Sequence, residues 1–178
     1  SSLGILPGTI EATVVVPPDA ARVAEVLEGD SEIGTIICEV SGANYGSVPL
    51  PYGFLGALRQ LADQHNAVLI FDEVITGFRW SPGGLQARDE IIPDLTSMAK
   101  IVTGGLPGGA VGGKEEIMRL LDPTHEYKGK KPGVVHKGTF NGSPLVSASG
   151  VAALTQVKTG EPNRLADAAA ERLRNGMG

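Results

Sequence analysis

The chain has 178 residues, of which 42 % are apolar, which is enough for about one globular domain with a sizeable buried core. Its 15 basic and 20 acidic residues give a net charge of -5, so no basic excess is available to hold a nucleic-acid backbone. No apolar run approaches the roughly 18 residues that cross a bilayer, and the first residues do not resemble a secretion signal. We therefore expect a soluble protein without a membrane span, and nonspecific nucleic-acid binding is disfavoured.

Cysteine, histidine and glycine usage narrows the class further. Cys38 is the only cysteine, so no intrachain disulfide can form, and the three histidines have no metal-ligand spacing. We therefore expect a cytoplasmic protein without a structural metal. The 25 glycines are about twice the average share of ~7 %, and they cluster without a repeat. This pattern indicates close backbone approaches in a globular fold.

The first 72 residues predict the order βαβαβ. Strands are expected at residues 12–16, 33–38 and 67–71. A helix capped by Asp19 would bury Val23 and Leu27, and a second helix would bury Phe54 and Leu58. Residues 67–71 are continuously apolar, which suits a strand that is covered on both faces of a parallel sheet.

The alternation loosens after Asp72 and then resumes. Short strands are expected at 95–99 and 109–112, and helices at roughly 114–121, 144–158 and 162–174. Alternating elements of this kind predict an α/β fold, a three-layer sandwich with a mostly parallel sheet. Ligands of such folds bind beyond the carboxyl ends of the strands.

Two carboxylates, Asp72 and Glu73, stand where the strand at 67–71 meets its loop. One of them is expected to face inward, and a buried carboxylate is costly without a cation or strong donor. If Asp72 is the inward one, a protonated heterocyclic nitrogen would serve it as well as an arginine. A turn-forming or capping role explains Asp72 equally well.

Lys100 is an isolated amine between the apolar stretch 95–99 and a glycine-containing segment. Desolvation favours the neutral amine, which is the nucleophile in Schiff-base chemistry. The alternative is an ordinary solvated lysine.

Three further patterns carry less chemistry. Residues 108–114 fit the first part of a P-loop, but Glu115 stands where a magnesium-binding Ser or Thr is required. Residues 141–143 fit a glycosylation sequon, which we interpret as a turn because Pro144 follows and nothing suggests secretion. Residues 138–144, with Thr139, would present a hydroxyl and backbone N–H groups to an anion, and a capped helix start explains them equally well.

Taken together, these segments resemble a known family. The block 68–79 (VLIFDEVITGFR), the block 93–100 (PDLTSMAK) and the block 104–113 (GGLPGGAVGG) resemble the class III, fold-type I aminotransferases that use pyridoxal 5'-phosphate. The blocks occur in family order, with 28 residues between Asp72 and Lys100, and residues 136–150 also match. Within the class, the chain is most similar to the glutamate-1-semialdehyde aminomutase branch, with the D-phenylglycine-type transaminases as close relatives.

The resemblance implies specific roles. Lys100 would form the Schiff base with the cofactor and act as base and acid, and the cofactor would alternate with its pyridoxamine 5'-phosphate form. Asp72 would pair with the pyridinium nitrogen, and Val74, two residues on in an extended chain, would pack on the ring. Thr139 would donate to the cofactor phosphate of the neighbouring subunit, which implies a homodimer. Glu39 would end a central strand near the cofactor.

Three positions bear on which branch of the family, and so which substrate, is expected. Val40 stands where the family commonly has proline after that glutamate. Asn44 occupies about the place of a second glutamate found in ornithine- and 4-aminobutyrate-type relatives, as in the aminomutase branch. Phe140, beside Thr139, makes this position more similar to the phenylglycine-type sequences than to typical aminomutases.

The resemblance also implies that residues 1–178 form the central part of the cofactor-binding large domain, with the N-terminal part and the C-terminal small domain absent. The leading hypothesis is an aminotransferase or aminomutase that acts on a small amino compound. The alternatives are a related transaminase, or an inactive fragment that serves as a folding or dimerisation module. A dehydrogenase is disfavoured because no G-x-G-x-x-G opens the first turn between strand and helix.

Overall fold

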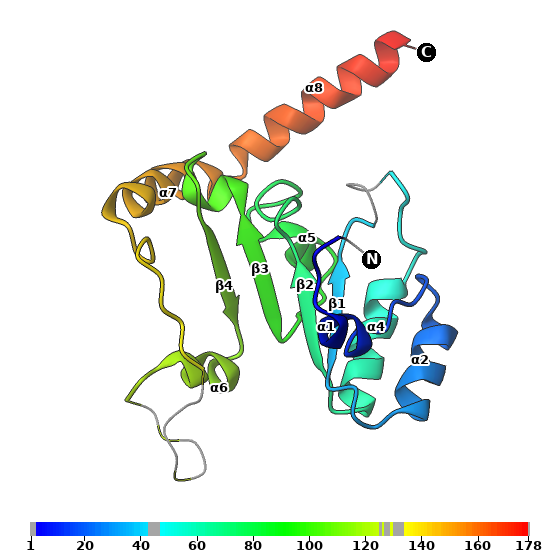
Figure 1. Cartoon of the computed structure of the whole chain (residues 1–178). Helices are drawn as coiled ribbons and strands as arrows, with labels where there is room; N and C mark the ends of the chain where they lie inside the picture. Colours follow the sequence, from blue (N-terminus) through cyan, green and yellow to red (C-terminus); the bar gives the residue numbers. More distant parts are fainter. Residues whose placement is uncertain (1–2, 43–46, 125, 127–128, 130–133, 178) are drawn as a thin grey trace.

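The computed structural model describes residues 3–42, 47–124, 126, 129 and 134–177 (Figure 1). Its strands are β1 (Thr35–Glu39), β2 (Val68–Asp72), β3 (Leu95–Ala99) and β4 (Gly109–Gly113). Its α-helices are α1 (Pro7–Glu11), α2 (Ala20–Gly29), α4 (Phe54–Gln64), α5 (Gly84–Arg88), α6 (Glu115–Met118), α7 (Pro144–Val157) and α8 (Glu161–Met177). Two 3₁₀ turns, η1 (Lys100–Thr103) and η2 (Arg119–Leu121), follow β3 and α6.

The four strands form one sheet in the order β1-β2-β3-β4. The pairs β1–β2 and β2–β3 are parallel, whereas β4 runs antiparallel to β3. Helices α2 and α4 lie beside the β1–β2 half of the sheet, and α7 lies beyond β4 (Figure 1). This arrangement confirms the predicted α/β fold with a mostly parallel sheet.

The core forms between β2 and α4. Leu69 and Phe71 are both 0 % exposed and alternate along β2, so they lie on one face of the sheet. Leu58 and Ala62 belong to the same buried cluster and lie one helical turn apart on α4. Burying a side chain such as Leu or Phe stabilises the fold by roughly 1.5–3 kcal/mol. The apolar stripe predicted from the sequence therefore holds the helical layer on the sheet.

One predicted strand is wrong. Residues 12–16 form no strand and are largely exposed, with Val15 at 91 %. Within the described residues the sheet ends at β1, and no ladder joins β1 to this segment. β-branched residues favour a strand only where a neighbouring strand completes the pairing and packing. Among the described residues from 12 to 72, the observed order is therefore α2, β1, α4 and β2.

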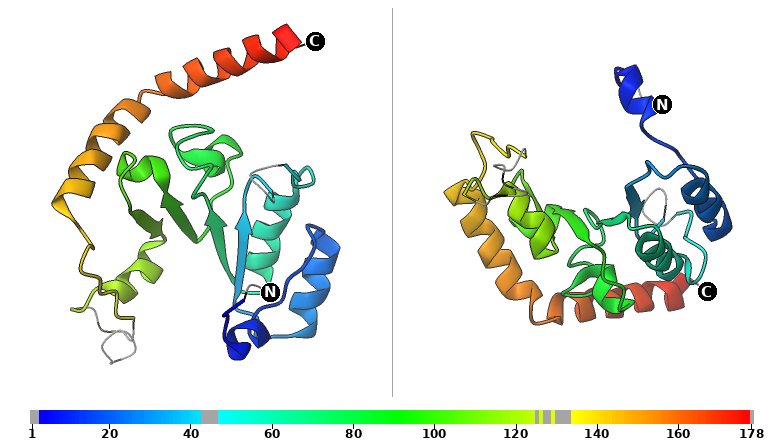
Figure 2. Two further views of the ribbon diagram at one scale, coloured as in Figure 1. Left: turned by 45° about the horizontal axis from the view of Figure 1, so that its top comes forward. Right: turned by 90° about the horizontal axis from the view of Figure 1, so that it is seen from below.

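The other predicted elements are present near their expected bounds. Asp19 caps α2 by accepting a hydrogen bond from the N–H of Ala21 at 2.9 Å. The helix predicted at 114–121 is divided into α6 and η2. Helix α8 projects away from the sheet (Figures 1 and 2). In the described part of the chain, no helix is long and apolar enough to cross a membrane.

The amino ends of the strands are held by a buried carboxylate, Asp94, directly before β3. It is 4 % exposed and accepts hydrogen bonds from the Leu69 N–H at 2.7 Å, from Arg59 Nη1 at 2.9 Å, and from Lys114 Nζ at 2.6 Å. Burial by itself would raise the pKa of this carboxyl, but the bonds from Lys114, Leu69 and Arg59 outweigh burial and hold the pKa below its ordinary value. Asp94 thus connects α4, β2 and the end of β4.

Candidate functional site

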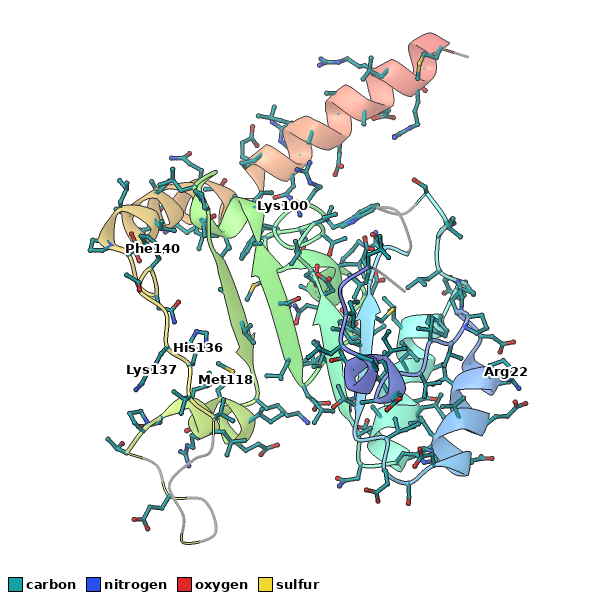
Figure 3. The ribbon with its side chains drawn as sticks, in the orientation of Figure 1. Arg22, Lys100, Met118, His136, Lys137 and Phe140 are labelled. Carbon is teal, nitrogen blue, oxygen red and sulfur yellow. The ribbon has the colours of Figure 1, made fainter. Side chains whose placement is uncertain are left out.

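Three polar residues form a row across the carboxyl ends of the parallel strands. Glu39 at the end of β1 pairs in register with Asp72 at the end of β2, and Asp72 pairs with Ser97 on β3. Lys100 follows directly after β3, at the same edge of the sheet (Figure 3). The structure therefore brings the predicted Asp72 and Lys100 to neighbouring strand ends, where α/β folds bind ligands. Glu39 ends the neighbouring strand, as expected.

Asp72 is half-buried, and both of its hydrogen bonds are made by one oxygen. Oδ1 accepts from the Val74 N–H at 2.9 Å and from the Ser97 hydroxyl at 3.3 Å. The bond from Val74 N confirms the turn-forming role that the sequence left open. Within residues 3–42, 47–124, 126, 129 and 134–177, no cation pairs with Asp72 and no hydrogen bond reaches Oδ2. This oxygen therefore remains available to a donor from a ligand.

The inward carboxylate is Glu73 rather than Asp72. Glu73 is 1 % exposed, and its two oxygens accept hydrogen bonds at 2.7–3.2 Å from the Thr76 hydroxyl, the Leu85 N–H and both the backbone and side-chain amides of Gln86. A buried carboxylate is tolerable with this many donors. Sequence reasoning assigned Glu73 no role, because all of these donors except Thr76 lie 12 or 13 residues further along the chain.

A glycine makes room for the Glu73 carboxylate. Gly84 has φ +74°, and a Cβ there would stand 2.6 Å from a Glu73 carboxylate oxygen. Only glycine fits both the backbone conformation and the space. The loop from Glu73 to α5 is therefore tied back to the residue next to Asp72.

Lys100 is exposed and has φ +55°. In this chain on its own the amine is therefore solvated, which is the alternative that the sequence left open. Left-handed backbone at a residue other than glycine costs about 1–2 kcal/mol, and such strain is concentrated at functional sites. The conformation turns the chain sharply from β3 into η1.

The turn η1 packs closely on α7. A Cβ at Gly104, which has φ +64°, would lie 2.4 Å from the Ser149 hydroxyl oxygen. A Cβ at Gly150 would lie 2.6 Å from the carbonyl oxygen of Val102. These contacts confirm that the glycine clusters serve close backbone approach, and they fix α7 against the segment that follows Lys100.

Val74 is half-buried and lies in a turn, because β2 ends at Asp72. The argument that Asp72 and Val74 share one side of an extended chain is therefore wrong, since the chain is no longer extended there. Val40, at the position of the family proline, is 3 % exposed in the core. The predicted position of Asn44 lies outside the described residues.

Thr139 is exposed in the turn before α7. With His136, Lys137, Gly138 and Asn141 it lines an open depression. Its neighbour Phe140 lies well away from Lys100 (Figure 3). Within the described part of the chain, no hydrogen bond joins Thr139 to Asp72 or Lys100.

A pocket of about 650 Å³ lies between α2, β1 and residues 11–18, and neither Asp72 nor Lys100 lines it. Among the residues that the structure describes, no group of three or more His, Cys, Asp or Glu side chains is arranged to hold a metal ion.

Comparison with known proteins decides the family. The sequence model described as Aminotransferase class-III matches residues 17–177. The chain belongs to the class-III aminotransferase family. The family resemblance of the sequence blocks around Asp72 and Lys100 is thereby confirmed.

Relatives of this class-III chain include both mutases and transaminases. A glutamate-1-semialdehyde 2,1-aminomutase of Nitratidesulfovibrio vulgaris (strain DP4) is 48 % identical over 154 residues, which is 85 % of this chain and 34 % of that protein. An omega-transaminase from Sphaerobacter thermophilus has a TM-score of 0.78 and 35 % identity, over 88 % of this chain and 35 % of that one. A transaminase with PLP bound has a TM-score of 0.78 and 31 % identity, over 88 % and 36 %. The chain spans about a third of the length of these relatives.

Proposed function

We propose that the protein containing this class-III chain is an enzyme dependent on pyridoxal 5'-phosphate, of the glutamate-1-semialdehyde 2,1-aminomutase type. The observation that carries the proposal is the pairing of Asp72, with a free carboxylate oxygen, and Lys100 at adjacent strand ends. The 48 % identity to an aminomutase and the likeness to a transaminase with PLP bound support it.

The residues at the carboxyl edge fit this cofactor. It requires an amine to hold its aldehyde carbon, an anion beside its ring nitrogen, and donors to its phosphate. Lys100 supplies the amine and Asp72 the anion, with Oδ2 of Asp72 accepting hydrogen bonds from no described residue. When bound, the cofactor supplies an electron sink for the bond broken at the substrate carbon.

Four residues of the chain then have proposed roles. Lys100 Nζ would hold the cofactor and afterwards take and return the proton that moves during amino transfer. Asp72 would keep the ring nitrogen protonated through its negative charge. Val74, half-buried in the next turn, would pack on the ring. Glu39 would stand beside them as the in-register neighbour of Asp72.

We further propose that the chain is the central part of the cofactor-binding large domain and that the protein is a homodimer. Support for the first point is that the chain covers about a third of its relatives. Support for the second is the apolar exposure around Thr139: Val135 is 70 %, Phe140 86 % and Leu145 72 % exposed. A second copy would cover these side chains and receive Thr139 at its phosphate site.

The proposed substrate is a small amino compound, and the proposed location is the cytoplasm. The single thiol, Cys38, suits a reducing compartment. Burial and the charge of Glu39 raise the pKa of this thiol to about 11, so it stays protonated at neutral pH.

The first experiment tests the cofactor site in the full-length natural protein. We expect added pyridoxal 5'-phosphate to give a visible absorbance band, and borohydride to fix its mass on the peptide that contains Lys100. The variant Lys100→Ala should lose both signals. Lys158→Ala, which removes a lysine from the far end of α7, is the matched control and should keep them. Adduct formation on a different lysine, or none at all, contradicts the proposal and favours an inactive module.

The second experiment tests the shared site. Lys100→Ala and Thr139→Ala lie in different subunits of each proposed site, so mixing the two variants should restore activity that neither has alone. Light scattering should give the mass of two copies. A monomer, or a mixture without restored activity, contradicts the dimer.

A transaminase is the second candidate, because the omega-transaminase from Sphaerobacter thermophilus is 35 % identical with a TM-score of 0.78. The two reactions differ in one requirement. An aminomutase returns the amino group to the same carbon skeleton, whereas a transaminase needs a separate 2-oxo acid as acceptor. Turnover of glutamate 1-semialdehyde without any added acceptor supports the aminomutase, and turnover only with an acceptor supports the transaminase.

A further inference from the structure

Ser97 is the one side chain of β3 that hydrogen-bonds to Asp72. Its hydroxyl donates to Asp72 Oδ1 at 3.3 Å, and the two residues are direct neighbours in the parallel pairing of β2 and β3. The Val74 N–H donates to the same oxygen at 2.9 Å. Two donors, one from the turn that follows Asp72 and one from the neighbouring strand β3, therefore converge on one oxygen.

This arrangement restricts the carboxylate. Rotation of an aspartate about its last bond is broad and roughly two-fold, so a free carboxylate exchanges its two oxygens easily. Donors that hold Oδ1 on one side leave Oδ2 as the oxygen presented to any further donor. Hydrogen bonds to a carboxylate are among the stronger ones in proteins, so their loss has a measurable effect.

The same residue also connects Asp72 to the strand that carries the lysine. The carbonyl of Ser97 accepts from the Glu73 N–H at 3.0 Å, and Ser97 lies three residues before Lys100. Main chain and side chain of Ser97 thus fix the end of β2 relative to the end of β3.

We propose that Ser97 is a positioning residue that holds Asp72 with Oδ2 directed to the ring nitrogen of the cofactor. The inference rests on the proposed function and adds a residue to which the sequence blocks assigned no role. Ser97 does not touch the reacting atoms and acts through Asp72 alone.

Thr96 offers a matched control. It is the preceding residue on β3, and its hydroxyl accepts from Gln86 Nε2 at 3.1 Å on the buried side of the sheet. Thr96→Val therefore removes the side-chain hydrogen bonding between β3 and Gln86 without touching Asp72. Ser97→Thr keeps the hydroxyl and suits a strand, so it serves as the conservative variant.

The experiment uses the full-length holoprotein loaded with pyridoxal 5'-phosphate that carries ¹⁵N in its ring. We expect Ser97→Ala to move the ring ¹⁵N chemical shift toward that of the unprotonated cofactor and to weaken cofactor retention about tenfold. Ser97→Thr and Thr96→Val should both stay within about twofold of the natural protein in retention and keep its chemical shift. If Ser97 had a purely structural role, Ser97→Ala would not change the ring ¹⁵N chemical shift selectively.

Two results would overturn the inference. If the natural protein forms its Lys100 adduct and Ser97→Ala keeps both the native chemical shift and the native retention, the positioning role alone is wrong. If the natural protein forms no Lys100 adduct, the proposed function fails and the positioning role fails with it. Should Ser97→Ala not fold, Ser97→Cys, a weaker donor at the same place, is compared in the same two measurements, and native values again overturn the role.

Discussion

Two aspartates at opposite ends of the parallel strands are held in contrasting ways. Asp94, at the amino end of β3, is 4 % exposed and ion-paired to Arg59 and Lys114. Asp72, at the carboxyl end of β2, is half-buried and held only by neutral donors. The charge of Asp94 is neutralised within the chain, whereas that of Asp72 is still available to a ligand. The amino edge therefore serves stability, and under the proposed function the carboxyl edge serves chemistry.

The largest expected effect concerns activity and is at the carboxyl edge. Lys100→Ala in the full-length protein should lower amino-transfer activity by about 10³-fold or more, because a single amine carries both attachment and proton transfer. Steady-state kinetics measure the loss, and thermal unfolding without cofactor should show the variant to be as stable as the natural protein. Lys158→Ala serves as the control. Activity within tenfold of native would remove Lys100 from the mechanism.

The next largest expected effect concerns stability and is at the amino edge. Asp94→Ala leaves Arg59 without its buried partner and the Leu69 N–H without an acceptor. We expect the free energy of unfolding to fall by about 3–5 kcal/mol, measured by urea denaturation. Asp72→Ala, the matched change at the other edge, should cost less than about 1.5 kcal/mol. Equal losses from both variants would refute the division of roles.

Acid titration tests whether the charged form of Asp94 stabilises the fold. Because the pKa of Asp94 is lower in the folded than in the unfolded state, its contribution to stability is fully present above the unfolded value of about 4. This contribution is lost as the pH falls through the lower, folded-state value. Urea denaturation at a series of pH values should show that Asp94→Asn loses less of its unfolding free energy below pH 4 than the natural protein does, by about the share of one carboxyl group. An identical slope in both proteins would show that Asp94 is not the group responsible.

The smallest expected effect concerns the backbone at Lys100, where φ is +55°. Glycine adopts this conformation without the strain that any side chain adds. Lys100→Gly should therefore be more stable than Lys100→Ala by about 1 kcal/mol, in spite of the greater freedom of glycine in the unfolded chain. Denaturation of the two inactive variants side by side measures the difference. Greater stability of the alanine variant would show that the strain at this position is negligible.

Much of the fold could be predicted because its signals are local. The apolar stripe of α4 and the continuous apolar run of β2 are complete within about ten residues each. Strand β2 lies near its predicted bounds, and α4 buries the predicted Phe54 and Leu58. The predicted strand at 12–16 had the same kind of local signal and failed. Its formation depends on a neighbouring strand, which a local pattern does not contain.

The candidate site was predictable in its members and not in its geometry. Asp72 and Lys100 were selected by sequence blocks, and the parallel sheet brings them to one edge. That Glu73 is the inward carboxylate depends on amides at Leu85 and Gln86, far along the chain. The partnership of Ser97 with Asp72 depends on strand register, which sequence alone did not fix.

The left-handed backbone at Lys100 also has an evolutionary consequence. A lysine is retained at such a position only while selection for its amine outweighs the steady advantage of glycine. If the proposed function holds, position 100 is therefore expected to change early to glycine or asparagine in descendants that lose the reaction, ahead of neighbouring positions without positive φ. A homologue with glycine at this place would be marked by that one exchange as a former enzyme.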